Sequence, residues 1–141
     1  MIVVDVNVVV YLLTDSPSRT LARRVHEIDP VWRVPPLWRH ELLNVLATLT
    51  RQQVLDADGA LMLWRNALRM LGSREQQPDM EQALSLAIDQ RISAYDAQYV
   101  ALAAACAVPL ISEDKRLQRQ LPEQVMSMER FAGLERSPRA S

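Results

Sequence analysis

The sequence predicts an α/β protein with a central parallel sheet and helices on both faces, an α/β/α sandwich. Short apolar runs rich in β-branched residues alternate with longer segments whose apolar residues recur at helical spacing. Long helical connections separate the strands, as parallel strands require. With 141 residues, 49% of them apolar, the chain is long enough for one domain with a single core. We expect that domain over residues 1–131 and a flexible tail over 132–141.

The N-terminal half is predicted to form two strands and three helices. Residues 1–4 are an unbroken apolar run led by β-branched side chains, which is typical of a central parallel strand buried on both faces. Asp5 and Asn7 end this strand, and residues 8–13 begin the connection to the next element. We expect a second strand at 31–34 and helices at 17–28, 37–52 and 56–71.

The C-terminal half begins with a polar segment, 73–77, that is either a loop or an edge strand. Pro78 and Asp79 then start a helix that continues to about residue 90. The remaining elements are a helix from Ser93, a strand at 108–111, a short helix at 115–120 and a strand at 125–128. The side chains expected to face the core are Leu61, Trp64, Leu68 and Leu71 in the helix at 56–71, and Met80, Ala83, Leu84, Ala87 and Ile88 in the next helix.

The stretch from Ser93 to Asp114 carries an acidic residue at each end of a helix–strand unit. Ser93 can cap the helix, and Asp96 falls in its first turn. The apolar face of this helix is predicted to consist of Tyr95, Tyr99, Leu102, Ala103 and Cys106, which recur at helical spacing. Asp114 follows the strand at 108–111. A helix that leads into a parallel strand runs antiparallel to it, so the start of the helix and the end of the strand lie at the same edge of the sheet. We therefore expect Asp96 and Asp114 to face one another there.

Two further acids are predicted at the same edge. Asp5 ends the first strand, and Glu41 lies early in the helix that leaves the second strand. Functional sites in such sheets form at the carboxyl ends of strands. Three of the acids also have structural explanations, because Asp96 could complete a capping box, Glu41 could favour the helix dipole and Asp114 could be an N-cap. Asp5 is the hardest to explain structurally, since it follows a fully apolar strand.

Carboxylates packed together repel one another, and either protonation or a hard cation relieves that repulsion. Ligands that are all oxygen suit Mg²⁺ or Mn²⁺. Such ions can hold a phosphodiester and assist its hydrolysis. The chemistry needs no histidine, and we expect surface or structural roles for His26 and His40.

Three segments match one known pattern in order and spacing. They are VVDVNVVVYLL at 3–13, HELLNVLATL at 40–49 and ISAYDAQYVALAAACAVPLISEDKRL at 92–117. The third segment is specific by itself, and the first two gain specificity from their position relative to it. Together they resemble the PIN-domain family, and most closely the VapC-type ribonuclease toxins of VapBC toxin–antitoxin pairs. The resemblance covers residues 1–131 and implies a PIN-like fold.

The resemblance also implies a Mg²⁺- or Mn²⁺-dependent endoribonuclease that hydrolyses RNA. The acids that characterise the family fall on Asp5, Glu41, Asp96 and Asp114. Three of them, Asp5, Asp96 and Asp114, would bind metal directly, and Glu41 would bind metal or orient the attacking water. Asn7 and Ser112 match positions that support the acids by hydrogen bonds. Family members are often homodimers, and an antitoxin protein usually holds them inactive.

The basic residues beside the acidic edge are candidates for contacts with RNA phosphates. They are Arg39, Lys115, Arg116 and Arg119. Aromatic residues make up only 5% of the chain, and no stacking platform for unpaired bases is evident. Substrate choice would then depend on the shape of the RNA and on local loops.

Two other functions fit the same residues. One is a PIN-like module that binds RNA or a protein partner without cleaving. The other is a phospho-acceptor or haloacid-dehalogenase-like domain that uses Asp5 as a nucleophile, with Lys115 as its supporting cation.

Composition limits the possible kinds of binding site and the cellular compartment. The net charge is −1 and no run of like charge suggests an arm that binds nucleic acid, so RNA binding would need a local patch or a bound metal. The one cysteine, Cys106, excludes an internal disulfide and a cysteine-based zinc site, and a reduced cytoplasm is the natural compartment. No apolar run approaches the ~20 residues of a membrane span, and the N-terminus is a poor signal peptide.

Overall fold

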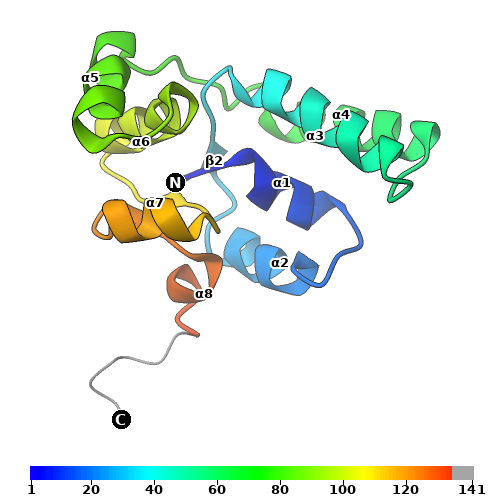
Figure 1. Cartoon of the computed structure of the whole chain (residues 1–141). Coiled ribbons are helices and arrows are strands. Elements are labelled where there is room, and N and C mark those ends of the chain that lie inside the picture. The colour runs from blue at the N-terminus through cyan, green and yellow to red at the C-terminus, as the bar shows by residue number, and fades with distance from the viewer. Residues whose placement is uncertain (135–141) are drawn as a thin grey trace.

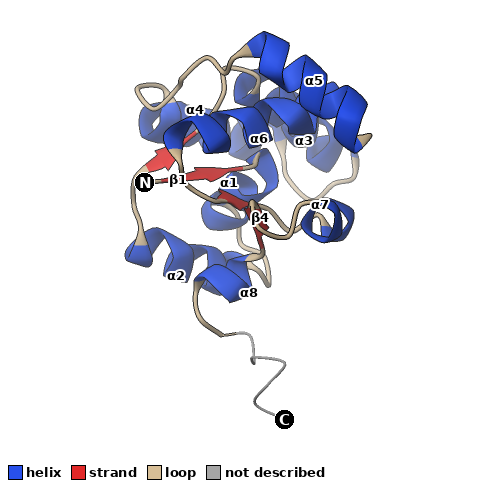
Figure 2. Ribbon diagram, turned by 90° about the vertical axis from the view of Figure 1, so that its left-hand side faces the viewer, coloured by secondary structure: helices blue, strands red, loops and turns tan. Residues whose placement is uncertain are grey.

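A four-stranded parallel sheet forms the centre of the protein, in a computed structural model that describes residues 1–134. The strands are β1 (Ile2–Val4), β2 (Trp32–Arg33), β3 (Leu110–Ile111) and β4 (Val125–Met126), in the order β2-β1-β3-β4. The helices are α1 (Val6–Leu13), α2 (Arg19–Ile28), α3 (Trp38–Arg51), α4 (Ala57–Leu71), α5 (Met80–Gln90), α6 (Ala94–Cys106), α7 (Lys115–Gln120) and α8 (Met128–Phe131). Figures 1 and 2 show the strands enclosed between helices, which confirms the predicted α/β class.

The central strand divides the core into two layers because its side chains alternate between the faces of the sheet. Ile2 and Val4 belong to the cluster that packs against α1, α2, α3, α4 and α8. Val3 points the other way and packs with residues of α6 and α7. All three are buried, as expected for a strand with helices on both faces. Helix α5 lies outside this sandwich and packs on α6.

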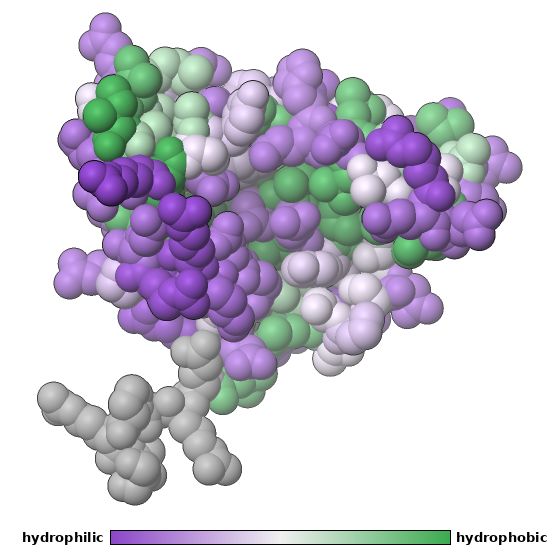
Figure 3. Space-filling view, in the orientation of Figure 1, coloured by the Kyte–Doolittle hydropathy of each residue, from purple (hydrophilic) through white to green (hydrophobic). Residues whose placement is uncertain are grey.

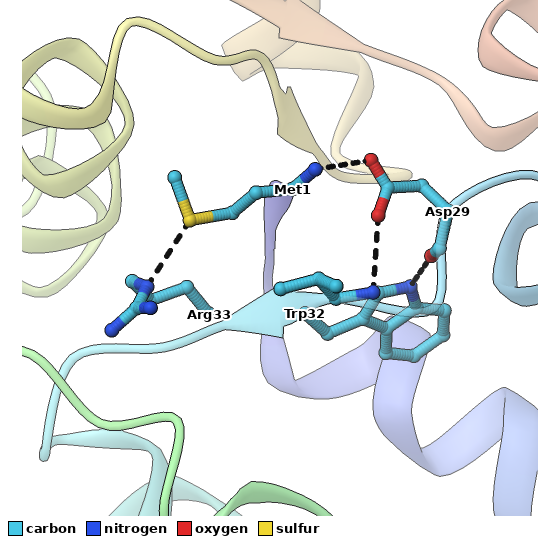
Figure 4. Close-up of polar contacts among 5 residues, drawn as sticks. Met1, Asp29, Trp32 and Arg33 are labelled. Carbon is cyan, nitrogen blue, oxygen red and sulfur yellow. Dashed lines mark hydrogen bonds and ion pairs between the residues drawn. The ribbon is translucent and has the colours of Figure 1, made fainter.

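The edge strand β2 is tied to the start of β1 by polar groups around Asp29 (Figure 4). The terminal amine of Met1 binds Asp29 Oδ2 at 2.5 Å, and the backbone N–H of Val31 donates to Oδ1 at 3.0 Å. The indole Nε1–H of Trp32 donates to the backbone carbonyl of Asp29 at 2.8 Å. These bonds satisfy the polar groups where α2 ends and β2 begins.

Several of the helix and strand boundaries predicted from the sequence are wrong. Helix α1 begins at Val6, directly after β1, where we expected a connection over residues 8–13. The last strand stops at Met126, and Met128 opens α8 instead of ending the strand. Segment 73–77 was expected to be either a loop or an edge strand. It is a loop that forms one isolated parallel bridge, between Glu75 and Val34. Of the predicted tail, residues 135–141 lie outside the described part of the chain.

The predicted core faces of α4 and α5 are partly wrong. Leu61 is 52% exposed, and α4 buries Leu63 and Ala67 instead. On α5, Met80, Leu84 and Ile88 are all exposed, and only Ala83 is fully buried. Helix α5 contacts the rest of the protein mainly through α6, so no element among residues 1–134 covers its opposite stripe. Figure 3 shows apolar surface over this helix.

The C-terminal end of α6 offers a test of local strain. Ala107 caps this helix with φ of 55°, in the left-handed region that favours glycine. Because Ala107 is exposed and a glycine there removes the Cβ clash, we expect Ala107→Gly to stabilise the fold by roughly 0.5–1 kcal/mol. Thermal unfolding followed by circular dichroism measures this, and an unchanged or lower Tm would contradict it. The matched control is Ala104→Gly, within the same helix, which should destabilise by about 1 kcal/mol.

Candidate active site

The four predicted acids come from four different elements at the C-terminal edge of the sheet. Asp5 follows β1 and is the N-cap of α1, and Asp114 follows β3 and is the N-cap of α7. Glu41 and Asp96 each lie in the first turn of a helix, α3 and α6 respectively. Strand C-termini and helix N-termini meet at one edge in this topology, so acids far apart in sequence share one region.

Among the four acids, Asp5 has the most strongly raised pKa. Its side chain accepts a hydrogen bond from the backbone N–H of Val8 at 3.1 Å, which caps α1. Burial raises the pKa of Asp5 from 3.8 to about 6. Hydrogen bonds from Ser112 and Val8 oppose this rise, whereas the charges of Asp96 and Glu41 add to it. These surroundings disfavour the charged form of Asp5, and a nearby cation would favour it.

Glu41 is held by a buried tyrosine of α6. The hydroxyl of Tyr99, a residue only 3% exposed, donates to Glu41 Oε1 at 2.6 Å. Burial raises the pKa of Glu41, the bond from Tyr99 lowers it, and the charge of Asp96 raises it further. Burial and the neighbouring Glu41 raise the pKa of Tyr99, so its hydroxyl keeps its proton and remains a donor. The helical spacing of Tyr99 predicts only a place on the apolar face of α6 and does not reveal this role.

Asp96 and Asp114 lie beside one another, as the helix–strand unit predicts. Both line one hollow of about 150 Å³. Burial raises the pKa of Asp96, with the charge of Asp114 as the next cause. Asp114 itself is exposed and accepts from the backbone N–H of Leu117 at 3.0 Å. The Asp96 backbone N–H donates to Ser93 Oγ at 2.9 Å, so the predicted Ser93 cap is confirmed.

Ser112 joins two of the acids. It is 1% exposed, its Oγ accepts from the backbone N–H of Asp114 at 3.2 Å, and its hydroxyl lowers the pKa of Asp5 by hydrogen bonding. Asn7 is exposed on α1, and among residues 1–134 its side chain has no hydrogen-bond partner. The supporting role of Ser112 therefore has a geometric basis, whereas that of Asn7 stays a prediction.

The donor set fits a hard cation in its chemistry but forms an open array. All four groups are carboxylates, and their mutual charges raise the pKa values of Asp5, Glu41 and Asp96. Within residues 1–134, no three His, Cys, Asp or Glu side chains are placed so that they could hold a metal ion together. A cation at this edge would have to draw the side chains toward itself.

The family model of the PIN domain matches residues 2–121. The chain belongs to the PIN domain family. Two solved structures share the fold: PAE2754 from Pyrobaculum aerophilum, with a TM-score of 0.73 and 17% identity over 93% of this chain and 92% of that one, and FitAcB from Neisseria gonorrhoeae, with a TM-score of 0.67 and 18% identity over 91% of this chain and 98% of that one. No curated protein compared with the chain matches it. PIN domains are generally nucleases.

The basic residues around this PIN domain edge differ from those expected. Arg39 forms an ion pair with Glu75, and this bond lowers the pKa of Glu75. Trp38 Nε1–H donates to the same Glu75 oxygen at 2.6 Å, so Arg39 belongs to a structural network. Arg116 lines the hollow with the acids. Arg116 therefore lies beside the acids and Arg39 is held by Glu75, and the phosphate role of both stays a prediction.

The other two predicted phosphate contacts, Lys115 and Arg119, are exposed on α7 outside the lining of that hollow. Arg91 lines it and was missed. It is the C-cap of α5, with φ of 53°, and stands two residues before the Ser93 cap. Its position two residues before Ser93, at the start of the helix that carries Asp96, could have indicated from the sequence that Arg91 lies near the acids.

A second hollow, of about 350 Å³, adjoins Glu41. It is lined by Leu37, His40, Glu41, Asn44 and Tyr95. Tyr95 is 62% exposed, although its helical spacing predicts a place on the apolar face of α6. Its ring is a stacking surface that the low aromatic content did not suggest. His40 is exposed, as expected, whereas the ring of His26 packs edge-on against Trp32 at 5.2 Å.

The hydrogen bond between Tyr99 and Glu41 predicts a measurable effect. We expect Tyr99→Phe to destabilise the protein by roughly 1–2 kcal/mol, because a half-buried carboxylate loses its donor. The same change should raise the pKa of Glu41, since the Tyr99 bond lowers it. Urea denaturation measures the first effect, and a carboxyl pH titration by NMR measures the second. Tyr11→Phe is the matched control, and equal effects for both variants would contradict the role of Tyr99.

Proposed function

We propose that this PIN domain is a metal-dependent endoribonuclease that hydrolyses RNA phosphodiester bonds, using Mg²⁺ or Mn²⁺. The observation that carries this proposal is the meeting of four carboxylates from four elements at one edge of the sheet, where the charges of neighbouring acids help to raise the pKa values of Asp5, Glu41 and Asp96. Structural ion pairs would relieve such repulsion, but among residues 1–134 none of the ion pairs involves these four acids. A cation is the simplest missing partner.

Each residue then has a role that follows from its position. Asp5, Asp96 and Asp114 would hold the ion, which when bound supplies positive charge to the phosphodiester and its leaving oxygen. Glu41, oriented by the Tyr99 hydroxyl, would accept a hydrogen bond from the attacking water and so direct it toward phosphorus. Ser112 would hold the Asp5 carboxyl by a hydrogen bond and fix the backbone of Asp114 beside it.

A cleavage assay tests the proposal. Purified protein is incubated with total RNA and with tRNA in the presence of Mn²⁺, Mg²⁺ or EDTA. Discrete fragments that require metal are expected. The comparison variant is Asp114→Asn, because asparagine also caps a helix and Asp114 is exposed, so the fold is preserved. Binding of RNA without cleavage by wild-type protein in every metal would favour the non-catalytic binding module instead.

The toxin role is a further part of the proposal, and it rests on the resemblance to VapC-type toxins. It implies a cytoplasmic protein with an antitoxin partner. No helix within residues 1–134 is long and apolar enough to cross a membrane. An apolar hollow of about 600 Å³ between α3 and α4, lined by Leu43, Leu46, Leu61 and Trp64 among others, suits an apolar segment of a partner protein better than RNA. Growth arrest on expression, relieved by the product of a neighbouring small gene, is the expected result.

A homodimer is the other proposed assembly. The exposed side chains of Met80, Leu84 and Ile88 recur at four-residue spacing on α5, and a second copy could cover this stripe. Light scattering after size-exclusion chromatography should give the mass of two chains, and Leu84→Glu should reduce it to one. A monomeric wild-type protein would contradict the proposal.

A further inference from the structure

Two hollows of different chemistry flank the carboxylates. The basic hollow, about 150 Å³, includes Arg91, Arg116, Asp96 and Asp114 in its lining. The aromatic hollow, about 350 Å³, is lined by Leu37, His40, Glu41, Asn44 and Tyr95. Each hollow contains part of the acidic set, so a molecule that reaches the acids meets both.

The first turn of α6 separates the two hollows. Tyr95 and Asp96 are consecutive residues of this helix. Consecutive helical residues diverge by about 100° around the axis, so their side chains point to different sides. Tyr95 enters the aromatic hollow and Asp96 the basic hollow. A flexible chain that crosses this turn would therefore have one unit on Tyr95 and the next beside Asp96.

The aromatic hollow has the groups that a nucleobase needs. Tyr95 is 62% exposed and lines this hollow, so its ring is accessible for stacking. Leu37 supplies apolar contact, and His40 and Asn44 can donate and accept hydrogen bonds at base edges. Among residues 1–134, none hydrogen-bonds the side chain of His40, Asn44 or Tyr95, so these groups are available to a ligand. A volume of about 350 Å³ is at the lower end of the range for ligand pockets.

The basic hollow has the groups that a phosphate needs. Within the described chain, neither Arg91 nor Arg116 forms an ion pair, in contrast to Arg39, which pairs with Glu75. A guanidinium matches the geometry of a phosphate and binds it through paired N–H donors. The adjoining carboxylates would repel a phosphate unless a cation neutralised them, so the arginines and the cation would act together.

We propose that single-stranded RNA binds across the first turn of α6, with one unpaired base stacked on Tyr95 in the aromatic hollow and the neighbouring phosphate in the basic hollow between Arg91 and Arg116. This inference rests on the proposed function, because it takes the carboxylates between the hollows as the place of cleavage. It specifies the substrate as an unpaired segment. A base inside a duplex is already stacked on both faces and has no free face for Tyr95.

Equilibrium binding without cleavage tests this. Labelled RNA of one arbitrary sequence, about ten nucleotides long, is titrated by fluorescence anisotropy, single-stranded or annealed to its complement. The buffer contains Ca²⁺, a hard cation that also takes oxygen ligands, and gel electrophoresis checks that the RNA stays intact. Tyr95→Ala should weaken single-strand binding roughly tenfold, since stacking contributes about 1–3 kcal/mol per base. Tyr95→Phe, which keeps the ring, should bind single strands within about threefold of the wild-type affinity.

The phosphate contact is tested by the salt dependence of binding. Arg91→Ala should reduce the slope of log K against log salt concentration by about 0.7, which corresponds to one lost phosphate contact on a single strand. Arg65→Ala, the same charge change on the exposed surface of α4, is the matched control.

The outcomes separate this inference from the proposed function. Binding that depends on Tyr95 and Arg91, from a protein that cleaves no RNA, would support the inference and contradict the nuclease. Metal-dependent cleavage with single-strand binding unchanged in Tyr95→Ala would support the nuclease and overturn the inference. Equal or tighter binding of the duplex, or equal losses in Arg91→Ala and Arg65→Ala, would also overturn it. Circular dichroism confirms that each variant is folded.

Discussion

Asp5→Asn is expected to make the metal-free protein more stable at neutral pH while removing its nuclease activity. The reason is that burial raises the pKa of Asp5 to about 6, so the folded protein holds an unfavourable carboxylate above that pH. Asparagine is as good an N-cap as aspartate and can keep the bond from the Val8 N–H. We expect the free energy of unfolding to increase by about 1–3 kcal/mol. The upper figure is the free energy that corresponds to the full pKa shift, and the lower figure allows for solvent around this half-buried group.

The pH dependence has a definite sign. Between pH 3.8 and about 6 the folded state binds more protons at Asp5 than the unfolded state, so the stability of the wild type falls as the pH rises. The loss is complete above about pH 6, and the contributions of Glu41 and Asp96 have the same sign because their pKa values are also raised. In Asp5→Asn this part of the dependence disappears. The gap in Tm between variant and wild type should therefore open from pH 4 to pH 7, to roughly 3–10 °C.

Metal addition should reverse the order of the two proteins. If Asp5 helps to hold a cation, Mn²⁺ at about 1,000 times its Kd should stabilise the wild type by about 4 kcal/mol and Asp5→Asn far less. The control Asp5→Ala lacks both the charge and the cap, and it should be less stable than Asp5→Asn by about 1 kcal/mol. Scanning calorimetry from pH 4 to pH 8, with EDTA or Mn²⁺, measures all three proteins. An unchanged Tm for Asp5→Asn at pH 7.5 in EDTA would contradict the raised pKa.

The positions of the acids could be predicted from sequence because they depend only on topology. Asp5 and Asp114 follow short apolar strands, and Glu41 and Asp96 lie in the first turn of helices. Once the strands are known to be parallel, all four must lie at one edge. The spacing of the buried residues identifies the strands, and no side-chain detail is needed.

The supporting residues could not be predicted in the same way, because their roles depend on packing between distant elements. Tyr99 and Glu41 are 58 positions apart, and their hydrogen bond requires α6 to lie against α3 at one particular rotation. The pairing of Arg39 with Glu75 likewise depends on a bridge that joins segment 73–77 to the end of β2.

Exposed apolar residues caused the other errors. Helical spacing shows which residues share a face but does not show whether another element covers that face. On α5 the stripe of Met80, Leu84 and Ile88 has the spacing of a core face, yet it lies on the outside because α5 packs mainly on α6. Tyr95 was misplaced for the same reason, since it shares a helix face with Tyr99 but lies one turn earlier, beyond the covered region. Both errors leave apolar surface for which we have proposed partners.

Asp96→Asn is expected to have the largest effect on cleavage, because Asp96 is the acid that interacts with each of the others. Its charge raises the pKa values of Asp5 and Glu41, and the charge of Asp114 raises its own. We expect cleavage to fall roughly 10³-fold, against roughly 10²-fold for the exposed Asp114. Single-turnover cleavage of one RNA fragment gives both rates. Asparagine keeps the backbone bond from residue 96 to Ser93 Oγ, so the start of α6 should be unchanged.

The same variant distinguishes a charged array from four unrelated caps. If the carboxylates share one field, removing the charge of Asp96 should lower the pKa of Asp5 and that of Glu41. The fall at Asp5 should be partial, because burial is the main cause of its raised pKa and remains in place. Carboxyl titrations by NMR in Asp96→Asn and in Asp58→Asn, an acid on the exposed surface of α4, provide the comparison. Equal pKa values for Asp5 in both variants, together with intact cleavage, would mean that Asp96 serves only the first turn of its helix.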